Sequence, residues 1–181
     1  MKENKKKKKL NPQKRGAEFQ NIIRDSLVYY EAQRAIVPNF WDRPQKHIAS
    51  NKKLISDFWY VPMSTRNLSL LEAKVVNSRT SFALSRIEDH QLINLYNVLR
   101  YDVGNGHLVV HFKYGKEDYG VFAIDGKTLM YDKDSGVKSY KLSDIVKWAN
   151  TRSRAGFFKI PFRKVLFGED SVKILELERI F

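Results

Sequence analysis

The sequence predicts an α/β protein in which helices pack on a sheet. Apolar residues recur at helical spacing over residues 19–30, while apolar runs of strand length occur at 68–76, 107–115 and 118–126. The elements follow one another as a helix, strands, a helix and further strands, which is the order of an α/β sheet covered by helices. With 181 residues, the chain is expected to form a single domain with its own core.

Composition excludes several classes of protein. The chain is 43% hydrophobic and 13% aromatic, as globular proteins are, and it contains no cysteine. Disulfide frameworks, thiolate metal sites and cysteine nucleophiles are therefore excluded. No apolar run is long enough to span a membrane, and the basic N-terminus lacks the apolar segment of a secretory signal. We expect a cytoplasmic protein with no membrane partner.

Charge is the strongest signal in the composition. The net charge is +13, of which residues 1–15 carry +7, so that +6 remains on residues 16–181. Residues 1–15 are expected to be a disordered basic arm, acting either as a solubility or localisation tail or as a sequence-independent contact to phosphates. Because the rest of the chain stays basic without the arm, we favour a polyanionic partner.

The first helix is predicted to begin after Gly16 and to end before Pro38. Its apolar residues recur at intervals of three and four, which gives one face that docks on a core. Residues 38–56 contain two prolines and several basic residues without a sustained period. They are expected to form a strand and an exposed loop or hairpin.

The second helix is predicted from a capping box, in which Ser85 caps the helix and Glu88 reaches back to the cap. Residues 107–115 and 118–126 are predicted to be antiparallel strands joined by a turn. Gly104 and Gly106 are expected to form a turn before them. A helix near residues 143–149 and an apolar, alternating C-terminus complete the chain.

The strand at 68–76 carries two charged residues on one face. Glu72 and Lys74 are two residues apart, so their side chains project to the same side of the strand. Burying two charges there is costly unless they are compensated. The pair is therefore either a structural ion pair, a solvent-exposed edge, or part of a functional site.

Two other polar residues favour the functional interpretation. Asp57 lies fifteen residues before Glu72, which leaves room for a turn and a return into an adjacent strand, and two carboxylates so placed suit Mg²⁺. Gln91, at the start of the second helix, could reach the same place. A carboxylate pair, a metal and Lys74 are what phosphodiester hydrolysis requires, since they activate water and neutralise charge on the phosphate.

These residues resemble the PD-(D/E)xK nuclease superfamily, and in detail the RecU-type Holliday junction resolvases. The resemblance rests on three segments spread over roughly residues 15–125: KRGAEFQNIIRDSLVYY, SDFW and EAKVVNSRTSFALSRIEDHQ. It implies a restriction-endonuclease-like mixed sheet flanked by helices, with a protruding basic stalk loop at about residues 43–54. It also implies a homodimer that uses Mg²⁺, with Mn²⁺ as a substitute, and makes paired nicks across a four-way DNA junction.

Individual roles are carried over from that resemblance. Asp57 and Glu72 become metal ligands with the carbonyl of Ala73, Lys74 becomes the catalytic lysine, and Gln91 a further residue of the catalytic site. The residues expected to contact DNA are Arg15, Arg43, Lys46, Lys52 and Lys53. Recombinase or branch-migration proteins are further candidate partners, on which the residues themselves are silent.

The chain departs from the family pattern at two places. Gln20 stands where the family usually has Glu, and Arg43 stands near the position of a family lysine. Two other functions remain compatible with the sequence. One is a PD-(D/E)xK nuclease that acts on other branched or duplex DNA, and the other is a non-catalytic DNA-binding protein.

Overall fold

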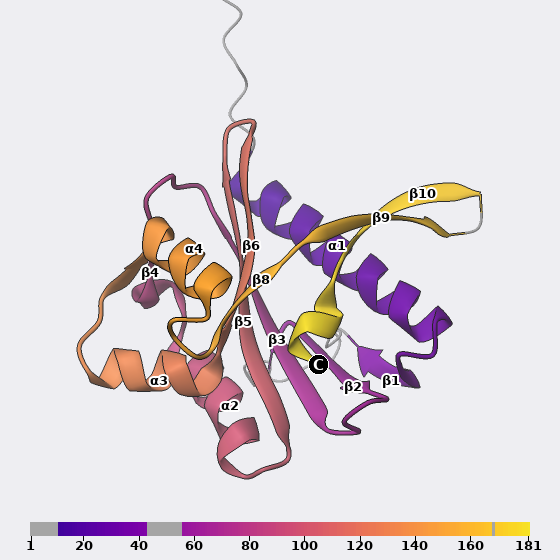
Figure 1. Cartoon of the computed structure of the whole chain (residues 1–181), viewed down its shortest axis with the longest axis horizontal. Coiled ribbons are helices and arrows are strands. Elements are labelled where there is room, and N and C mark those ends of the chain that lie inside the picture. Colours follow the sequence, from indigo (N-terminus) through magenta and orange to yellow (C-terminus); the bar gives the residue numbers. More distant parts are fainter. Residues whose placement is uncertain (1–10, 43–55, 168) are drawn as a thin grey trace, which may run out of the picture.

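A six-stranded mixed sheet with helices on both faces forms the centre of the molecule (Figure 1). The computed structural model describes residues 11–42, 56–167 and 169–181. The strand order is β1-β2-β3-β5-β6-β8, in which β3 and β5 are parallel and the other neighbouring pairs are antiparallel. The predicted α/β class, a central mixed sheet flanked by helices, is confirmed.

The bounds of the elements are as follows. The strands of the central sheet are β1 (Ile36–Asp42), β2 (Phe58–Pro62), β3 (Leu68–Val76), β5 (Gly104–Tyr114), β6 (Glu117–Asp125) and β8 (Phe157–Ile160). The short pairs β4 (Ser81–Ala83) with β7 (Ser139–Lys141), and β9 (Phe162–Phe167) with β10 (Asp170–Leu175), form two small sheets. The helices are α1 (Pro12–Ala32), α2 (Asp89–Arg100), α3 (Gly126–Asp134) and α4 (Leu142–Thr151), with 3₁₀ turns at η1 (Leu84–Arg86) and η2 (Leu177–Ile180).

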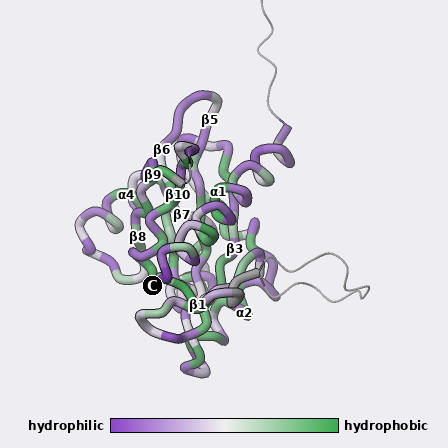
Figure 2. Tube along the Cα trace, turned by 90° about the vertical axis from the view of Figure 1, so that its right-hand side faces the viewer, coloured by the Kyte–Doolittle hydropathy of each residue, from purple (hydrophilic) through white to green (hydrophobic). Residues whose placement is uncertain are grey.

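The sheet separates two hydrophobic cores. On one face α1 packs its buried residues Phe19, Ile23 and Leu27 against the strands, as the spacing of these residues predicts. On the other face α2, α3 and α4 enclose a second core. Figure 2 shows the most hydrophobic stretches in the interior strands and polar ones at the free end of the β5–β6 hairpin.

The first helix starts earlier than predicted. Asn11 caps it, since its side-chain oxygen accepts a hydrogen bond from the N–H of Gln13, and Pro12 occupies the first turn. Residues 12–15 are therefore helical, although the sequence assigned them to the basic arm. Residues 1–10 of the predicted arm lie outside the described part of the chain.

The capping box of the second helix is also shifted. Glu88, not Ser85, is the N-cap of α2, and Gln91 is the residue that reaches back to the cap. Leu84 and Ile87 are both buried, and a 3₁₀ turn places residues three apart on the same side. The residues from 84 to 86 therefore form the separate turn η1, and the helix begins only at Asp89.

Gly104 and Gly106 lie inside β5 and do not form the predicted turn. A Cβ at Gly104 would lie 1.7 Å from the carbonyl oxygen of Leu68, and a Cβ at Gly106 would lie 2.2 Å from that of Leu95. Neighbouring backbones therefore approach β5 too closely for any side chain at these positions. At Gly106 this neighbour is α2, whose first turn carries Gln91.

Some expectations fall outside the described ranges. The predicted stalk at residues 43–54, with Arg43, Lys46, Lys52 and Lys53, is among them. Within the ranges that are described, no helix combines the length and the apolar character needed to span a bilayer.

Gly106→Ala should force α2 away from the sheet. The added methyl group overlaps the backbone of Leu95, so we expect a loss of about 2–3 kcal/mol in the free energy of unfolding measured in urea. Gly16→Ala is the matched control, because within the described part of the chain a Cβ at Gly16 meets nothing closer than 4 Å. Equal stability of the two variants would contradict the close packing of α2 on β5.

Candidate active site

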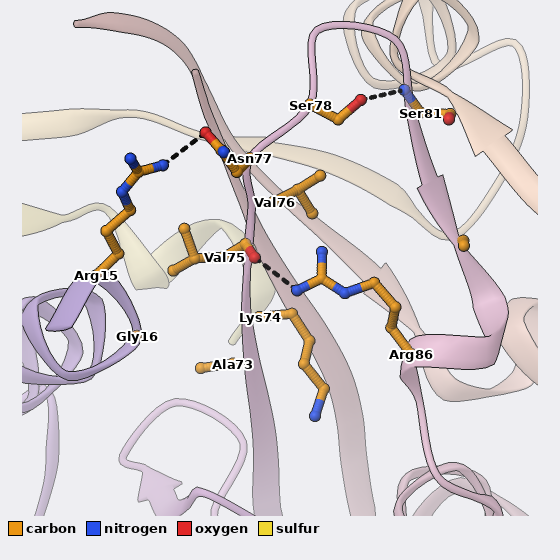
Figure 3. Close-up of a pocket in the computed structure, with 11 residues that line it drawn as sticks. Arg15, Gly16, Ala73, Lys74, Val75, Val76, Asn77, Ser78, Ser81 and Arg86 are labelled. Carbon is orange, nitrogen blue, oxygen red and sulfur yellow. Dashed lines mark hydrogen bonds between the residues drawn. The ribbon is translucent and has the colours of Figure 1, made fainter. Parts of the chain in front are cut away.

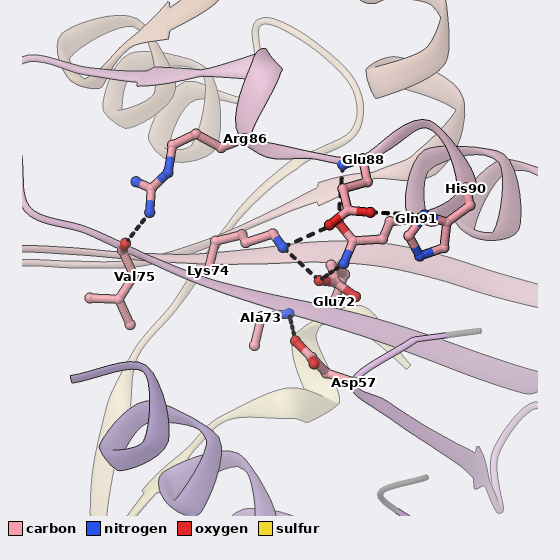
Figure 4. A network of polar contacts seen from close by, with 9 residues as sticks. All are labelled: Asp57, Glu72, Ala73, Lys74, Val75, Arg86, Glu88, His90 and Gln91. Carbon is pink, nitrogen blue, oxygen red and sulfur yellow. Dashed lines mark hydrogen bonds and ion pairs between the residues drawn. The ribbon is translucent and has the colours of Figure 1, made fainter. Parts of the chain in front are cut away.

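The site forms where β2 and β3 lie side by side. The two strands pair antiparallel with Phe58 opposite Leu71, so the residue before Phe58 lies beside Glu72. The carboxylate of Asp57 accepts a hydrogen bond of 2.9 Å from the backbone N–H of Ala73 (Figure 4). As predicted, the chain turns back between Asp57 and Glu72 to form an adjacent strand, and the two carboxylates are close neighbours.

Glu72 and Lys74 form a direct ion pair. The Lys74 ammonium lies 2.8 Å from Oε1 of Glu72. The Glu72 side chain is only 3% exposed, whereas that of Lys74 is 20% exposed. The pair therefore occupies a buried strand and opens towards solvent at its lysine end, so the exposed-edge interpretation is wrong.

Gln91 connects this pair to α2. Its amide nitrogen donates a 2.6 Å hydrogen bond to Oε1 of Glu72, and its amide oxygen accepts from the ammonium of Lys74 at 3.1 Å (Figure 4). The same oxygen accepts from the backbone N–H of Glu88 at 3.1 Å as part of the capping box. One side chain thus fixes the start of the helix and the position of both charged groups.

Burial and repulsion make Glu72 unusually basic. Removal from water and then the negative charge of Asp57 raise the pKa of Glu72 to about 7, although Lys74 opposes this shift. Two carboxylates that repel each other in a largely buried place are stabilised by a cation between them. Hard oxygen donors of this kind are typical ligands of Mg²⁺.

The donor set fits a metal that keeps part of its water shell. In the described ranges, no group of three or more His, Asp or Glu side chains is placed to hold a metal ion. Mg²⁺ commonly binds proteins through one or two carboxylates and retains several waters, so Asp57 and Glu72 suffice. The carbonyl of Ala73 as a third ligand stays a prediction.

The predicted DNA contact Arg15 and two further polar residues, Ser56 and His90, lie around the site. Arg15 lies on α1, and its guanidinium donates to the side-chain oxygen of Asn77 just beyond β3. Ser56 is buried and donates to the carbonyl of Phe58, which fixes the start of β2. At the start of α2, Nδ1 of His90 lies 3.3 Å from Oε2 of Glu88.

Sequence reasoning missed Arg86. Its guanidinium donates a 2.8 Å hydrogen bond to the carbonyl of Val75, one residue beyond Lys74. With Arg15 and Lys74 it lines a cleft of about 590 Å³ along the end of β3 (Figure 3). An exposed arginine between a serine and an apolar residue gives no periodic signal, so only the fold reveals its place.

The pKa of Glu72 predicts a pH-dependent stability of the metal-free protein. A carboxyl group whose pKa rises from 4.5 to about 7 on folding favours the folded state fully below pH 4.5 and loses this contribution as the pH rises through 7. As the pH rises from 5 to 8, the free energy of unfolding of the native protein should therefore fall by about 2–3 kcal/mol more than that of Glu72→Gln. The measurement is urea unfolding in the presence of EDTA.

The matched control for this measurement is Glu117→Gln, which changes a carboxylate that is half exposed on the β5–β6 hairpin. It should leave the pH dependence as it is. A parallel pH dependence for Glu72→Gln and the native protein would mean that Glu72 titrates normally.

Comparison with known proteins supports the resemblance seen in the sequence. No family model matches the chain. Over 119 residues it is 29% identical to the Holliday junction resolvase RecU of Listeria welshimeri, a match that covers 59% of each protein. The chain thus matches less than two thirds of that relative's length. The structure aligns with Hjc, a Holliday junction resolvase of Archaeoglobus fulgidus, at a TM-score of 0.37 and 14% sequence identity, over 62% of this chain and 78% of that one. The predicted similarity to the RecU-type resolvases is confirmed.

Proposed function

We propose that the protein is a structure-selective DNA endonuclease that depends on Mg²⁺ and resolves four-way junctions by paired symmetric nicks. One observation carries the proposal. Two carboxylates, Asp57 and Glu72, converge with the ammonium of Lys74 at a place that is buried on one side and open on the other. This combination suits a divalent cation and the phosphodiester beside it.

Each residue has a separate task in the proposed reaction. Asp57 and Glu72 would hold Mg²⁺, which supplies Lewis acidity that lowers the pKa of the attacking water and offsets charge on the phosphate. Lys74 places a positive charge beside the phosphoryl oxygens as negative charge develops on them. Gln91 holds the side chains of Glu72 and Lys74 at fixed positions, so little reorganisation is needed when the water attacks.

The substrate class follows from the charge and from the relative. A chain with a net charge of +13 is suited to a polyanion. The Listeria relative is described as a Holliday junction resolvase, so a four-way junction is the branched DNA that we propose here. Each such site cuts one strand, and a two-fold symmetric homodimer would deliver the two symmetric nicks.

A direct comparison of substrates tests the proposal. The full chain is incubated with Mg²⁺ and either a synthetic four-way junction or a linear duplex of equal length, and the products are sized by denaturing electrophoresis. Paired nicks in the junction alone are expected. Equal cutting of both would indicate a nuclease without junction selectivity, and salt-sensitive binding without cutting would indicate a non-catalytic DNA-binding protein.

Lys74→Met should remove the catalytic charge but keep the apolar stem of the side chain. We expect junction nicking to fall roughly 100- to 1,000-fold, as losses of single charge-stabilising groups do, while junction affinity in Ca²⁺ changes little. Lys138→Met, at an exposed position near β7, is the matched control and should cut normally. If Lys74→Met nicked the junction at the wild-type rate, Lys74 would have no catalytic role.

A further inference from the structure

The cleft beyond Lys74 is lined by positively charged and neutral residues. Eleven residues line it. Among the described residues of the lining three are basic, namely Arg15, Lys74 and Arg86, and none is acidic. Ser78 and Ser81 add hydroxyl groups. Its volume of about 590 Å³ lies in the range of ligand-binding clefts.

The two arginines keep their charge available for a ligand. Arg86 is fixed by the carbonyl of Val75 and Arg15 by the side-chain oxygen of Asn77, at 2.8 and 2.6 Å. Both acceptors are neutral, and no carboxylate in the described ranges forms an ion pair with either arginine. Figure 3 shows them approaching the end of β3 from opposite sides. A guanidinium has five N–H donors, so each retains donors for an anion.

The start of α1 adds positive charge to the same cleft. Its first turn contains basic but no acidic residues, although the positive end of the helix dipole favours acidic ones there. Lys14 and Arg15 thus stand at an unfavourable position in the isolated protein. Arg15 lines the cleft, so an anion bound there would compensate its charge and the positive end of the helix dipole.

Gly16 provides space in the wall of the cleft. It lies within α1, where glycine is less favourable than alanine, and a Cβ added there would meet no described residue within 4 Å apart from the backbone of its own helix. Packing and backbone conformation therefore do not require glycine at this position. Close approach of a ligand is the remaining use for the missing side chain.

From these observations we infer that the cleft binds the phosphodiester backbone of one DNA strand next to the phosphate that is cut. Arg86 and Arg15 contact its phosphates, and Gly16 lets the backbone lie against α1. From Lys74 to Asn77, just beyond the end of β3, the extended chain lengthens the site by roughly 10 Å. The inference rests on the proposed function, because it assigns the neighbouring phosphates of the same substrate.

Binding of a fluorescent four-way junction tests the inference without any cutting. Fluorescence anisotropy is measured with the full chain in Ca²⁺ between 50 and 200 mM salt. Arg86→Ala should raise the Kd roughly tenfold and lower the slope of log affinity against log salt by about one. Arg86→Lys should restore the slope, since it keeps the charge. Arg100→Ala, at the far end of α2, is the matched control and should bind normally.

Gly16→Ala separates binding from folding. Because alanine favours the helix and meets no neighbour, the variant should have an unchanged or higher Tm and yet bind the junction several-fold more weakly. Normal junction affinity and salt slope for both Arg86→Ala and Gly16→Ala would overturn the inference. If the native protein bound the junction without cutting it, the proposed nuclease function would fail but the DNA-binding cleft would stand.

Discussion

The buried carboxylate of Glu72 is the constraint on which the arrangement of the site depends. A charge in the middle of a strand that packs on a core must be compensated where it lies. Lys74 supplies this compensation from the same face of β3, and Gln91 supplies a hydrogen bond from α2. The helix can do so because Gly106 lets it lie directly on β5, which pairs with β3. Packing of backbone on backbone therefore fixes a charged site.

The same strand connects the site to the cleft. Lys74 belongs to both, since it pairs with Glu72 and also lines the cleft with Arg15 and Arg86. Negative charge is concentrated at Asp57 and Glu72, where a cation is expected, and positive charge is concentrated beside the end of β3, on Arg15 of α1 and Arg86 of η1. This separation of charge suits a metal ion at the carboxylate end and the phosphates of a DNA strand at the basic end. The proposed cleavage site and the proposed binding cleft are therefore adjacent.

Sequence patterns predicted what depends on local periodicity. Alternation along residues 68–76 correctly placed Glu72 and Lys74 on one face, and helical spacing found the buried face of α1.

Expectations failed where tertiary contacts decide. The burial of both Leu84 and Ile87 moves the helix start from Ser85 to Glu88, and the contact with α2 puts Gly106 in a strand. Helix α3 was missed although Asp125 caps it through Thr128, because it follows β6 without a loop. Gln91 was expected to reach the site from its place in the second helix and by resemblance, but its hydrogen bonds to Glu72 and Lys74 were not predicted, since periodicity says nothing of contacts between distant elements.

The most direct test of the account is to locate a divalent ion. Crystals of the protein soaked in Mn²⁺, which scatters anomalously and takes the same oxygen ligands as Mg²⁺, would reveal its position. The account predicts an anomalous peak within bonding distance of carboxylate oxygens of both Asp57 and Glu72, and loss of that peak in Glu72→Gln crystals. A fully soaked crystal with no peak between these residues would contradict it.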